Sequence, residues 1–240
     1  MMLSPPRLSY CFGVSAGAFV VPHTATPAMS AAGTTTKAIL PWALVDATAT
    51  GLGTSFATAD TGTGNLRVLA ANEYSTANTI ASSNNVLLTS GSTAAAASVA
   101  PNSLTIEGNA SLSLNAGVAL NLSSGGILVR AGSSSTISGG LFSQTNGFSP
   151  LNLWTVGDLT ITSPLNGGNG TSNGAIGTIK AGAGTLTLAP TAAAVNGLVA
   201  MGRNTMSGQV TLNDGTLKLG AGLTNVIQAN NYFSLNGGTL

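Results

Sequence analysis

The chain has 240 residues, of which 32 are glycine, 43% are apolar and only 5% are charged. An average soluble domain carries about a quarter charged residues, so the exposed surface of this protein must be built from Ser, Thr, Asn and Gly. The net charge of +1 and the scattered arginines exclude the basic stripe of a nucleic-acid-binding protein, and the single cysteine, Cys11, excludes an intrachain disulfide.

Residues 1–36 are expected to form a leader or a disordered N-terminus. Arg7 precedes a mildly apolar run at 10–21, and small residues follow at 28–32. This is the order of a signal peptide, namely a charge, an apolar core and a small-residue cleavage region. Because the apolar core contains Gly and Ser, an unstructured terminus remains an open alternative.

Residues 37–82 are predicted to form an irregular segment that leads into the regular part of the chain. Its apolar run at 39–45 is broken by Pro41, and four glycines punctuate the residues from 51 to 64. Alternation predicts one short strand at 66–69. The stretch from 70 to 81 is expected to be a helical turn or a loop.

From residue 83 onward the period-2 pattern of β-strands becomes steady. The predicted strands are three to six residues long, and glycine-containing turns separate them. No helical pattern separates the strands, which argues against a fold with alternating helices and strands. The predicted strands lie at 86–89, 103–107, 111–114, 118–122, 126–130, 136–138, 151–156, 158–162, 176–180, 185–188, 198–201, 209–212, 216–219 and 232–235.

A recurring motif favours a β-solenoid over a β-sandwich or barrel. The sequence Leu-Asn-Asp-Gly-Thr-Leu at 212–217 returns as Leu-Asn-Gly-Gly-Thr-Leu at 235–240, an offset of 23 residues (235 minus 212). Recurrence of a whole strand-turn-strand unit is typical of coils that stack on one another. We therefore predict an all-β chain in which residues 83–240 form a parallel β-solenoid.

Alternation also predicts which side chains point into the solenoid. Leu186 and Leu188 share one side of their strand, Leu217 and Leu219 share one side of theirs, and 118, 120 and 122 do the same. One coil holds too few such side chains to fold alone, so stability must come from stacking between neighbours. A charge at Leu186 should therefore unfold the surrounding coils.

The region 180–220 resembles the passenger-associated transport repeat, also called the autotransporter-associated β-strand repeat. The repeat reads roughly Lys-x-Gly-x-Gly-Thr-Leu-x-Leu, then Asn-Thr-Tyr-Thr-Gly, a strand, Asn-x-Gly-Thr-Leu and x-Leu-Gly. Met206 stands where an aromatic residue is usual, and 15 residues separate Leu188 from Asn204, so we expect a bulged insertion. The matching residues are Lys180, Gly182, Gly184, Thr185, Leu186, Leu188, Asn204, Thr205, Gly208, Asn213, Gly215, Thr216, Leu217, Leu219 and Gly220.

The resemblance implies a single-stranded, right-handed parallel β-helix from the passenger of a large bacterial autotransporter. Such a passenger is exported by type V secretion through a C-terminal translocator β-barrel, and the repeat is linked to folding and export. We expect a structural or adhesive protein at the cell surface or outer membrane, or secreted, with host or environmental surface glycans or proteins as partners. Because the motif restarts at 235–240, the chain is expected to be a fragment of a longer protein.

The charged residues predict no catalytic, cofactor-binding or metal site. Glycoside hydrolysis needs two carboxylates about 5–10 Å apart. No two acids lie close in the sequence, and Glu107 and Asp158 could meet only through coil stacking. Asp214 is expected in an Asp-Gly turn, and Lys180 and Lys218 on solvated outward faces. The sole histidine, at position 23, and Cys11 leave almost no means of building a zinc site or a Ser-His-Asp triad.

Three alternatives remain open from the sequence. A polysaccharide-acting β-helix enzyme, or a non-catalytic carbohydrate-binding solenoid, would place clustered acids or cations on one face. An ice-binding solenoid would need flat rows of Thr-x-Thr, of which 160–162 and 185–187 are the clear instances. Phe142, Phe148 and Trp154 could form a binding bulge around 141–150, although a local hydrophobic plug is the simpler interpretation.

Overall fold

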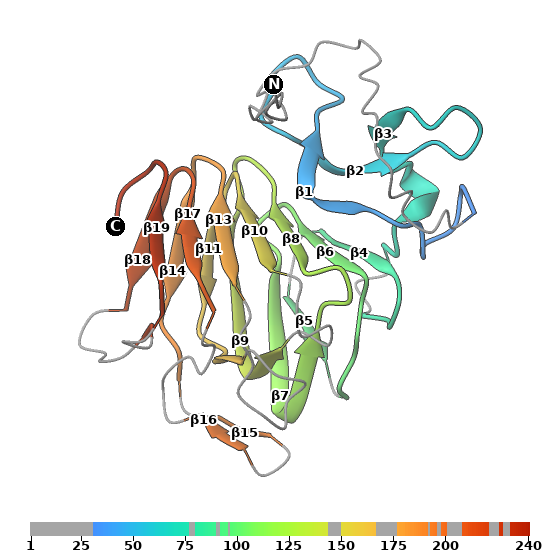
Figure 1. Ribbon diagram of the computed structural model, residues 1–240. Helices are drawn as coiled ribbons and strands as arrows, with labels where there is room; N and C mark the ends of the chain where they lie inside the picture. Colours follow the sequence, from blue (N-terminus) through green and yellow to red (C-terminus); the bar gives the residue numbers. More distant parts are fainter. Residues whose placement is uncertain are drawn as a thin grey trace, which may run out of the picture.

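The computed structural model describes residues 31–76, 80–89, 92–95, 97–143, 150–166, 177–191, 193–195, 198–200, 208–220, 226–227 and 231–240. Two sheets of parallel strands run along the molecule side by side (Figure 1). The chain moves from one sheet to the other and back in each coil, which confirms the predicted β-solenoid. Within the described residues the helical structure is one 3-10 turn, η1 (Ala71–Glu73).

Each complete coil contributes a strand to each of the two solenoid sheets. The first solenoid sheet contains β4 (Asn85–Leu88), β6 (Ser103–Ile106), β8 (Gly126–Val129), β10 (Leu151–Thr155), β13 (Thr178–Ala181), β17 (Val210–Leu212) and β19 (Phe233–Leu235). The second solenoid sheet contains β5 (Ser92–Ala95), β7 (Ser111–Asn121), β9 (Ser134–Ser143), β11 (Asp158–Ile161), β14 (Thr185–Leu188) and β18 (Thr216–Leu219), with β12 (Leu165–Asn166) beside β9.

The strand register confirms the recurrence and shows that coil length varies. Leu212 pairs with Leu235, and Thr216 forms a bridge with Thr239, as the 23-residue offset predicts. One equivalent position in the first solenoid sheet is occupied in turn by Asn85, Ser103, Gly126, Asn152, Ile179, Thr211 and Ser234. Successive differences are 18, 23, 26, 27, 32 and 23 residues. The 32-residue coil holds the predicted insertion, which includes the antiparallel hairpin β15 (Ala193–Val195) and β16 (Leu198–Ala200).

The two long strands bend and give the coil a short third side. Residues 111–114 and 118–122, predicted as separate strands, belong mostly to the continuous strand β7, whose register shifts between Leu114 and Ala119. Gly117 lies within this shift at φ +80°, a conformation that glycine adopts without steric penalty. After the bend, 119–121 pairs with 141–143, and β12 continues the ladder.

The interior is an apolar column of stacked side chains, and most of the predicted inward positions are confirmed. Leu186 and Leu217 are neighbours in this column, and both are buried, as are Val118 and Leu120. Leu219 differs, since 44% of its surface is exposed. It lies above Leu188, and no strand in the described part of the chain pairs with its other side.

A three-stranded antiparallel sheet packs on part of the outer face of the first solenoid sheet. It consists of β1 (Leu40–Val45), β2 (Ser55–Ala59) and β3 (Leu66–Val68), and only β3 is apparent from the sequence pattern. Pro41 is accommodated because β1 is an edge strand, where a missing N–H costs little. Phe56 of β2 packs with Leu128 and Trp154, and the Trp154 indole N–H donates to the Pro41 carbonyl at 2.9 Å.

Glycines allow close contact at the corner between the two sheets. Gly215 has φ +71°, and a Cβ there would overlap the carbonyl oxygens of Gly182 and Gly184 in the preceding coil. Gly132 occupies the same corner of an earlier coil at φ +74°, but a Cβ there would meet nothing within 4 Å. The two positions therefore share a backbone conformation and differ in their contacts.

Gly215→Ala is expected to destabilise the protein far more than Gly132→Ala. The left-handed conformation alone should cost each variant about 1–2 kcal/mol, whereas the overlap at 215 should raise its cost to about 3 kcal/mol. Urea unfolding followed by circular dichroism measures both. Equal losses would show that the corner is not closely packed at Gly215.

Candidate functional site

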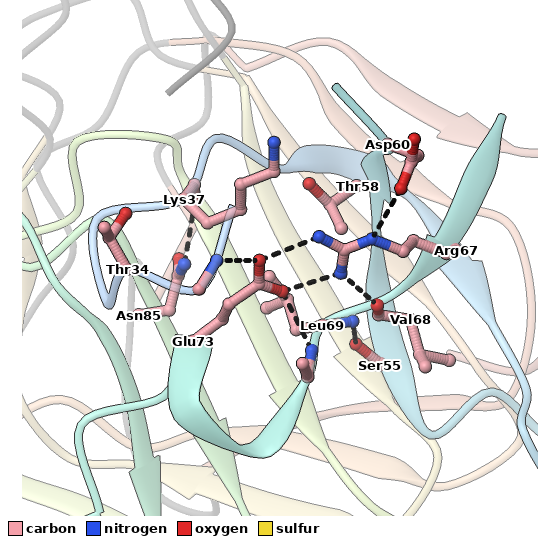
Figure 2. Close-up of polar contacts among 12 residues, drawn as sticks. Thr34, Lys37, Ser55, Thr58, Asp60, Arg67, Val68, Leu69, Glu73 and Asn85 are labelled. Atoms are coloured by element: carbon pink, nitrogen blue, oxygen red, sulfur yellow. Dashed lines mark hydrogen bonds and ion pairs between the residues drawn. The ribbon is translucent and has the colours of Figure 1, made fainter. Parts of the chain in front are cut away.

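The most elaborate polar cluster lies in the N-terminal sheet and consists of a buried carboxylate held by a guanidinium. Arg67 Nη1 and Nη2 contact Glu73 Oε2 and Oε1 at 2.7 and 2.8 Å, which gives a bidentate ion pair (Figure 2). Glu73 is completely buried, and its carboxylate also accepts from the N–H groups of Gly33 and Ala70, each at 2.9 Å. The carboxylate therefore accepts two hydrogen bonds from the guanidinium and two from the main chain.

The surroundings strongly favour the ionised form of Glu73. The hydrogen bond from Arg67 is the main cause that lowers its pKa from 4.5 to about 2, and it outweighs the opposing effect of burial. The same contact raises the pKa of Arg67. Asp60 lies 3.9 Å from Arg67 and accepts from the N–H groups of Gly62 and Thr63 in its own turn. The cluster connects the η1 turn with β3 and with the loop that contains Gly33. Its role is therefore to hold these segments of the N-terminal sheet together.

Glu73→Gln should lower the free energy of unfolding by about 3 kcal/mol at pH 7, since it removes one charge of a buried pair. The pKa of Glu73 is lower in the folded protein than its ordinary 4.5. The contribution of Glu73 to the free energy of unfolding is therefore complete above about pH 4.5 and is lost as the pH falls towards 2. Urea unfolding at a series of pH values measures this contribution. If the wild-type protein and the variant differ equally at pH 7 and pH 2.5, the ionised carboxylate is not the source of the effect.

Backbone and amide contacts connect the N-terminal segment to the first coil. The Asn85 N–H donates to the Thr35 carbonyl at 2.6 Å, and its side-chain amide donates to the Lys37 carbonyl at 2.8 Å. Ser75 pairs with β4, because its N–H donates to Asn85 O at 2.8 Å and its carbonyl accepts from Leu87 N–H at 3.0 Å. The outer edge of β4 is therefore covered.

Lys180 is buried in the interior, so the prediction of a solvated outward position is wrong. It stands in β13 between Leu153 and Leu212, two inward positions of the apolar column. Its Nζ bends to the corner and donates to the carbonyl oxygens of Gly182, Asp214 (2.9 Å) and Ala181 (3.4 Å). Burial lowers the pKa of Lys180 from 10.5 to about 8, although the carboxylates of Asp214 and Asp158 act in the opposite direction.

The geometry explains why a lysine is accommodated at an apolar position. Carbonyl oxygens at a tight corner have lone pairs that no strand partner reaches, and an ammonium group supplies three donors. Since Asp214 belongs to the coil that follows Lys180, the lysine side chain connects two coils. The strand alternation would place Ile179 inward and Lys180 outward. The Lys-x-Gly-x-Gly spacing is the sequence feature that accompanies a lysine at this corner.

The two acids that could have met by stacking have different partners. Glu107 forms an ion pair with Arg130 of the next coil. Asp158 accepts from the Thr185 N–H at 2.7 Å, in the second solenoid sheet. Asp214 accepts from the Gly215 N–H at 2.7 Å, and Gly215 has a positive φ, which confirms the predicted Asp-Gly turn. Each carboxylate thus supports a corner of the solenoid.

The outer face of the second solenoid sheet carries two columns of hydroxyl groups. These side chains are half-buried or exposed, and neighbours along a column are about 4.8 Å apart, the spacing between strands. The first column is Ser111, Thr136, Thr160, Thr187 and Lys218, and the second is Ser134, Asp158, Thr185, Thr216 and Thr239. With one carboxylate and one ammonium, this face presents mainly neutral hydrogen-bonding groups.

Several residues singled out in the sequence are not brought together or are not described. Phe142 packs in the solenoid interior, whereas Trp154 packs outside it against the N-terminal sheet, so these two aromatics do not form one cluster. Cys11, His23 and Phe148 lie outside the described residues, as does most of the proposed leader. Within the described ranges, no three His, Cys, Asp or Glu side chains gather in a way that could hold a metal ion.

Comparison of the chain with models of protein families, with curated proteins and with solved structures found no match. Among the described residues, no helix is long and apolar enough to cross a membrane.

Proposed function

We propose that this chain is a structural and adhesive passenger segment of a bacterial autotransporter, and that the repeat at 180–220 assists its folding and export. The observation that carries the proposal is the corner formed by Lys180, Gly182, Gly184 and Gly215. The lysine of one coil donates to a carbonyl of the next, and Gly215 lies directly against the carbonyls of Gly182 and Gly184. The motif residues therefore have a shared structural task.

This task suits a protein that folds after export. Stacking coils supply the stability of a solenoid, so a coil with a built-in connection to its neighbour is a good place for folding to begin. Export would proceed through a translocator β-barrel in type V secretion, and the folded chain would be displayed at the cell surface. The proposed export route and surface location rest on the resemblance of 180–220 to the autotransporter-associated repeat.

The hydroxyl columns of the second solenoid sheet are the proposed adhesive surface. Neutral hydroxyl groups in regular rows can exchange hydrogen bonds with the hydroxyl and amide groups of surface glycans or proteins. Each exposed hydrogen bond replaces one with water and contributes little alone, so binding would depend on many contacts made at once. Thr160 and Thr187, neighbours in one column, lie within this surface.

Protease shaving tests the location. Intact cells that produce the parent protein are treated with protease, and fragments of 31–240 are sought by mass spectrometry, with a periplasmic protein as the control for lysis. Release from intact cells is expected. If the fragments appear only after lysis, the surface assignment fails.

Binding of the purified chain to immobilised glycans and surface proteins tests the adhesive face. The double variant Thr160→Glu with Thr187→Glu should lose binding, whereas Trp42→Lys, which alters an exposed side chain of the N-terminal sheet, should retain it. Equal binding by both variants would remove the hydroxyl columns from the proposal.

A further inference from the structure

The middle of the outer face of the second solenoid sheet carries a grid of hydroxyl groups. Its rows are the outward residues of β7, β9, β11 and β14, strands that run side by side (Figure 1). The register places Thr160 between Thr136 and Thr187 in the first hydroxyl column. It places Ser113 beside Ser138 in a third column. We define the hydroxyl grid as Ser111, Ser113, Thr136, Ser138, Thr160, Thr162 and Thr187.

Most hydroxyls of the hydroxyl grid are not used by the fold. Elsewhere in the chain such groups hold the structure together, as Thr58 does when its hydroxyl donates to the Ala38 carbonyl at 2.6 Å. Within the grid, Ser111 and Thr162 make long contacts to the main chain, at 3.3 and 3.5 Å. The other five side chains form no hydrogen bond with any part of the protein that the structure describes, which leaves their donors and acceptors for a ligand. These five are Ser113, Thr136, Ser138, Thr160 and Thr187.

The hydroxyl grid is uncharged, and charged side chains lie at its border. Lys218 follows Thr187 in the same column. Asp158 precedes Thr160 by two residues in β11, and its carboxylate accepts from the Thr185 N–H at 2.7 Å. A hydroxyl group both donates and accepts, so the grid suits a neutral ligand that offers donors and acceptors in a regular array.

The hydroxyl grid has two fixed repeats. Neighbours in a column are separated by the distance between strands, about 4.8 Å, and alternate residues of one strand are about 6.6 Å apart. Leu159 and Leu186 are buried beneath the grid and hold its strands in place, so little freedom is lost when a ligand binds. Oxygen atoms on the prism face of hexagonal ice repeat at spacings close to both distances.

We propose that the hydroxyl grid binds the surface of ice. Its unused hydroxyls hold a first layer of water molecules at the repeats of the grid, and those molecules join the ice lattice. One such hydrogen bond contributes little, because it replaces a bond with liquid water, so adsorption depends on many contacts made at once. The inference goes beyond the proposed function. It uses the same face as the proposed adhesive surface but does not depend on export.

Partition of the purified chain into slowly growing ice tests the proposal, together with thermal hysteresis. The wild-type chain should be enriched in the ice and should lower the freezing point below the melting point. Thr160→Lys should reduce the enrichment at least about tenfold, because the ammonium group keeps its own hydration shell and its stem holds the ice away from the neighbouring hydroxyls. Thr61→Lys adds the same side chain at an exposed threonine between β2 and β3 and should leave the enrichment unchanged.

Circular dichroism shows whether the variants are folded, and Thr136→Lys, in the same column as Thr160→Lys, should have the same effect on ice binding. A wild-type chain that is excluded from ice and shows no thermal hysteresis would overturn the proposal, as would equal enrichment of the grid variants and Thr61→Lys. A chain that binds immobilised glycans but not ice would overturn this inference and leave the adhesive surface standing. A chain that binds ice but is not released by protease shaving would support the inference and refute the surface location.

Discussion

Leu186→Asp is expected to lower the free energy of unfolding by more than about 4 kcal/mol and to disrupt the coils of β11, β14 and β18. Leu186 is completely buried and stacks between Leu159 and Leu217 in the apolar column. The substitution forfeits about 1.5–3 kcal/mol of side-chain burial. It also places a carboxylate in the apolar column, so the charge must be neutralised or the column must open. Thermal and urea unfolding followed by circular dichroism measure the loss.

Thr187→Asp is the matched control, because it places the same carboxylate on the next residue of the same strand. Thr187 points outward and lies between Thr160 and Lys218 in the first hydroxyl column. A carboxylate there stays hydrated and gains a cross-strand cation, so the change in stability should stay within about 1 kcal/mol. If both variants lost equal stability, the assignment of inward and outward faces would be wrong.

The regular part of this fold could be predicted because its stability is local and repeated. Thr-Leu-Thr-Leu at 185–188 fixes which side of the strand is buried, and the Leu-Asn-x-Gly-Thr-Leu recurrence fixes which strands are neighbours. The pairing of Leu212 with Leu235 follows from those two facts alone. In a parallel solenoid each coil contacts only its neighbours, so sequence similarity between coils is enough to predict which strands pair.

The N-terminal sheet could not be predicted in the same way. β1 contains Pro41, and β2 is only five residues long, so neither shows a clear strand pattern. What orders them is contact with residues more than 60 positions later, including Phe56 with Leu128 and Pro41 with Trp154. The Arg67–Glu73 pair also lacks a signal, because side chains six residues apart are not neighbours in a regular helix or a regular strand.

Lys180 shows how alternation can mislead at one position. Thr178-Ile179-Lys180-Ala181 has a single large apolar residue, and placing it inward would put the lysine outward. The register with Leu153 and Leu212 requires the reverse. The corner carbonyls decide the outcome, since they accept from an ammonium group that the apolar column would otherwise exclude. The Gly182 carbonyl follows Lys180 by two residues, but the Asp214 carbonyl comes from the next coil, so its role as an acceptor is known only from the fold.

Lys180→Ala is expected to lower the free energy of unfolding by about 4–5 kcal/mol at pH 7. Truncation removes three buried methylene groups at about 0.8 kcal/mol each and leaves the carbonyls of Gly182 and Asp214 without this donor, at about 1–3 kcal/mol each. Relief from burying a charge offsets part of this sum. Lys180→Met keeps the stem and loses only the charge, so it should cost about 2 kcal/mol. Urea unfolding measures each variant, and Lys218→Ala, at an exposed lysine, should change stability by less than about 0.5 kcal/mol.

The pH dependence distinguishes a buried ammonium group from simple packing. The pKa of Lys180 is about 8 in the folded protein, below its ordinary 10.5, so between these values the unfolded chain binds more protons than the folded one. The free energy of unfolding of the wild-type protein should therefore rise between pH 8 and pH 10.5, by up to about 3 kcal/mol relative to Lys180→Met. The Lys218→Met variant should keep the same rise as the wild-type protein. A difference between the wild-type protein and Lys180→Met that stays constant from pH 7 to pH 10.5 would mean that Lys180 contributes only through its stem, and that its amine titrates as it would in water.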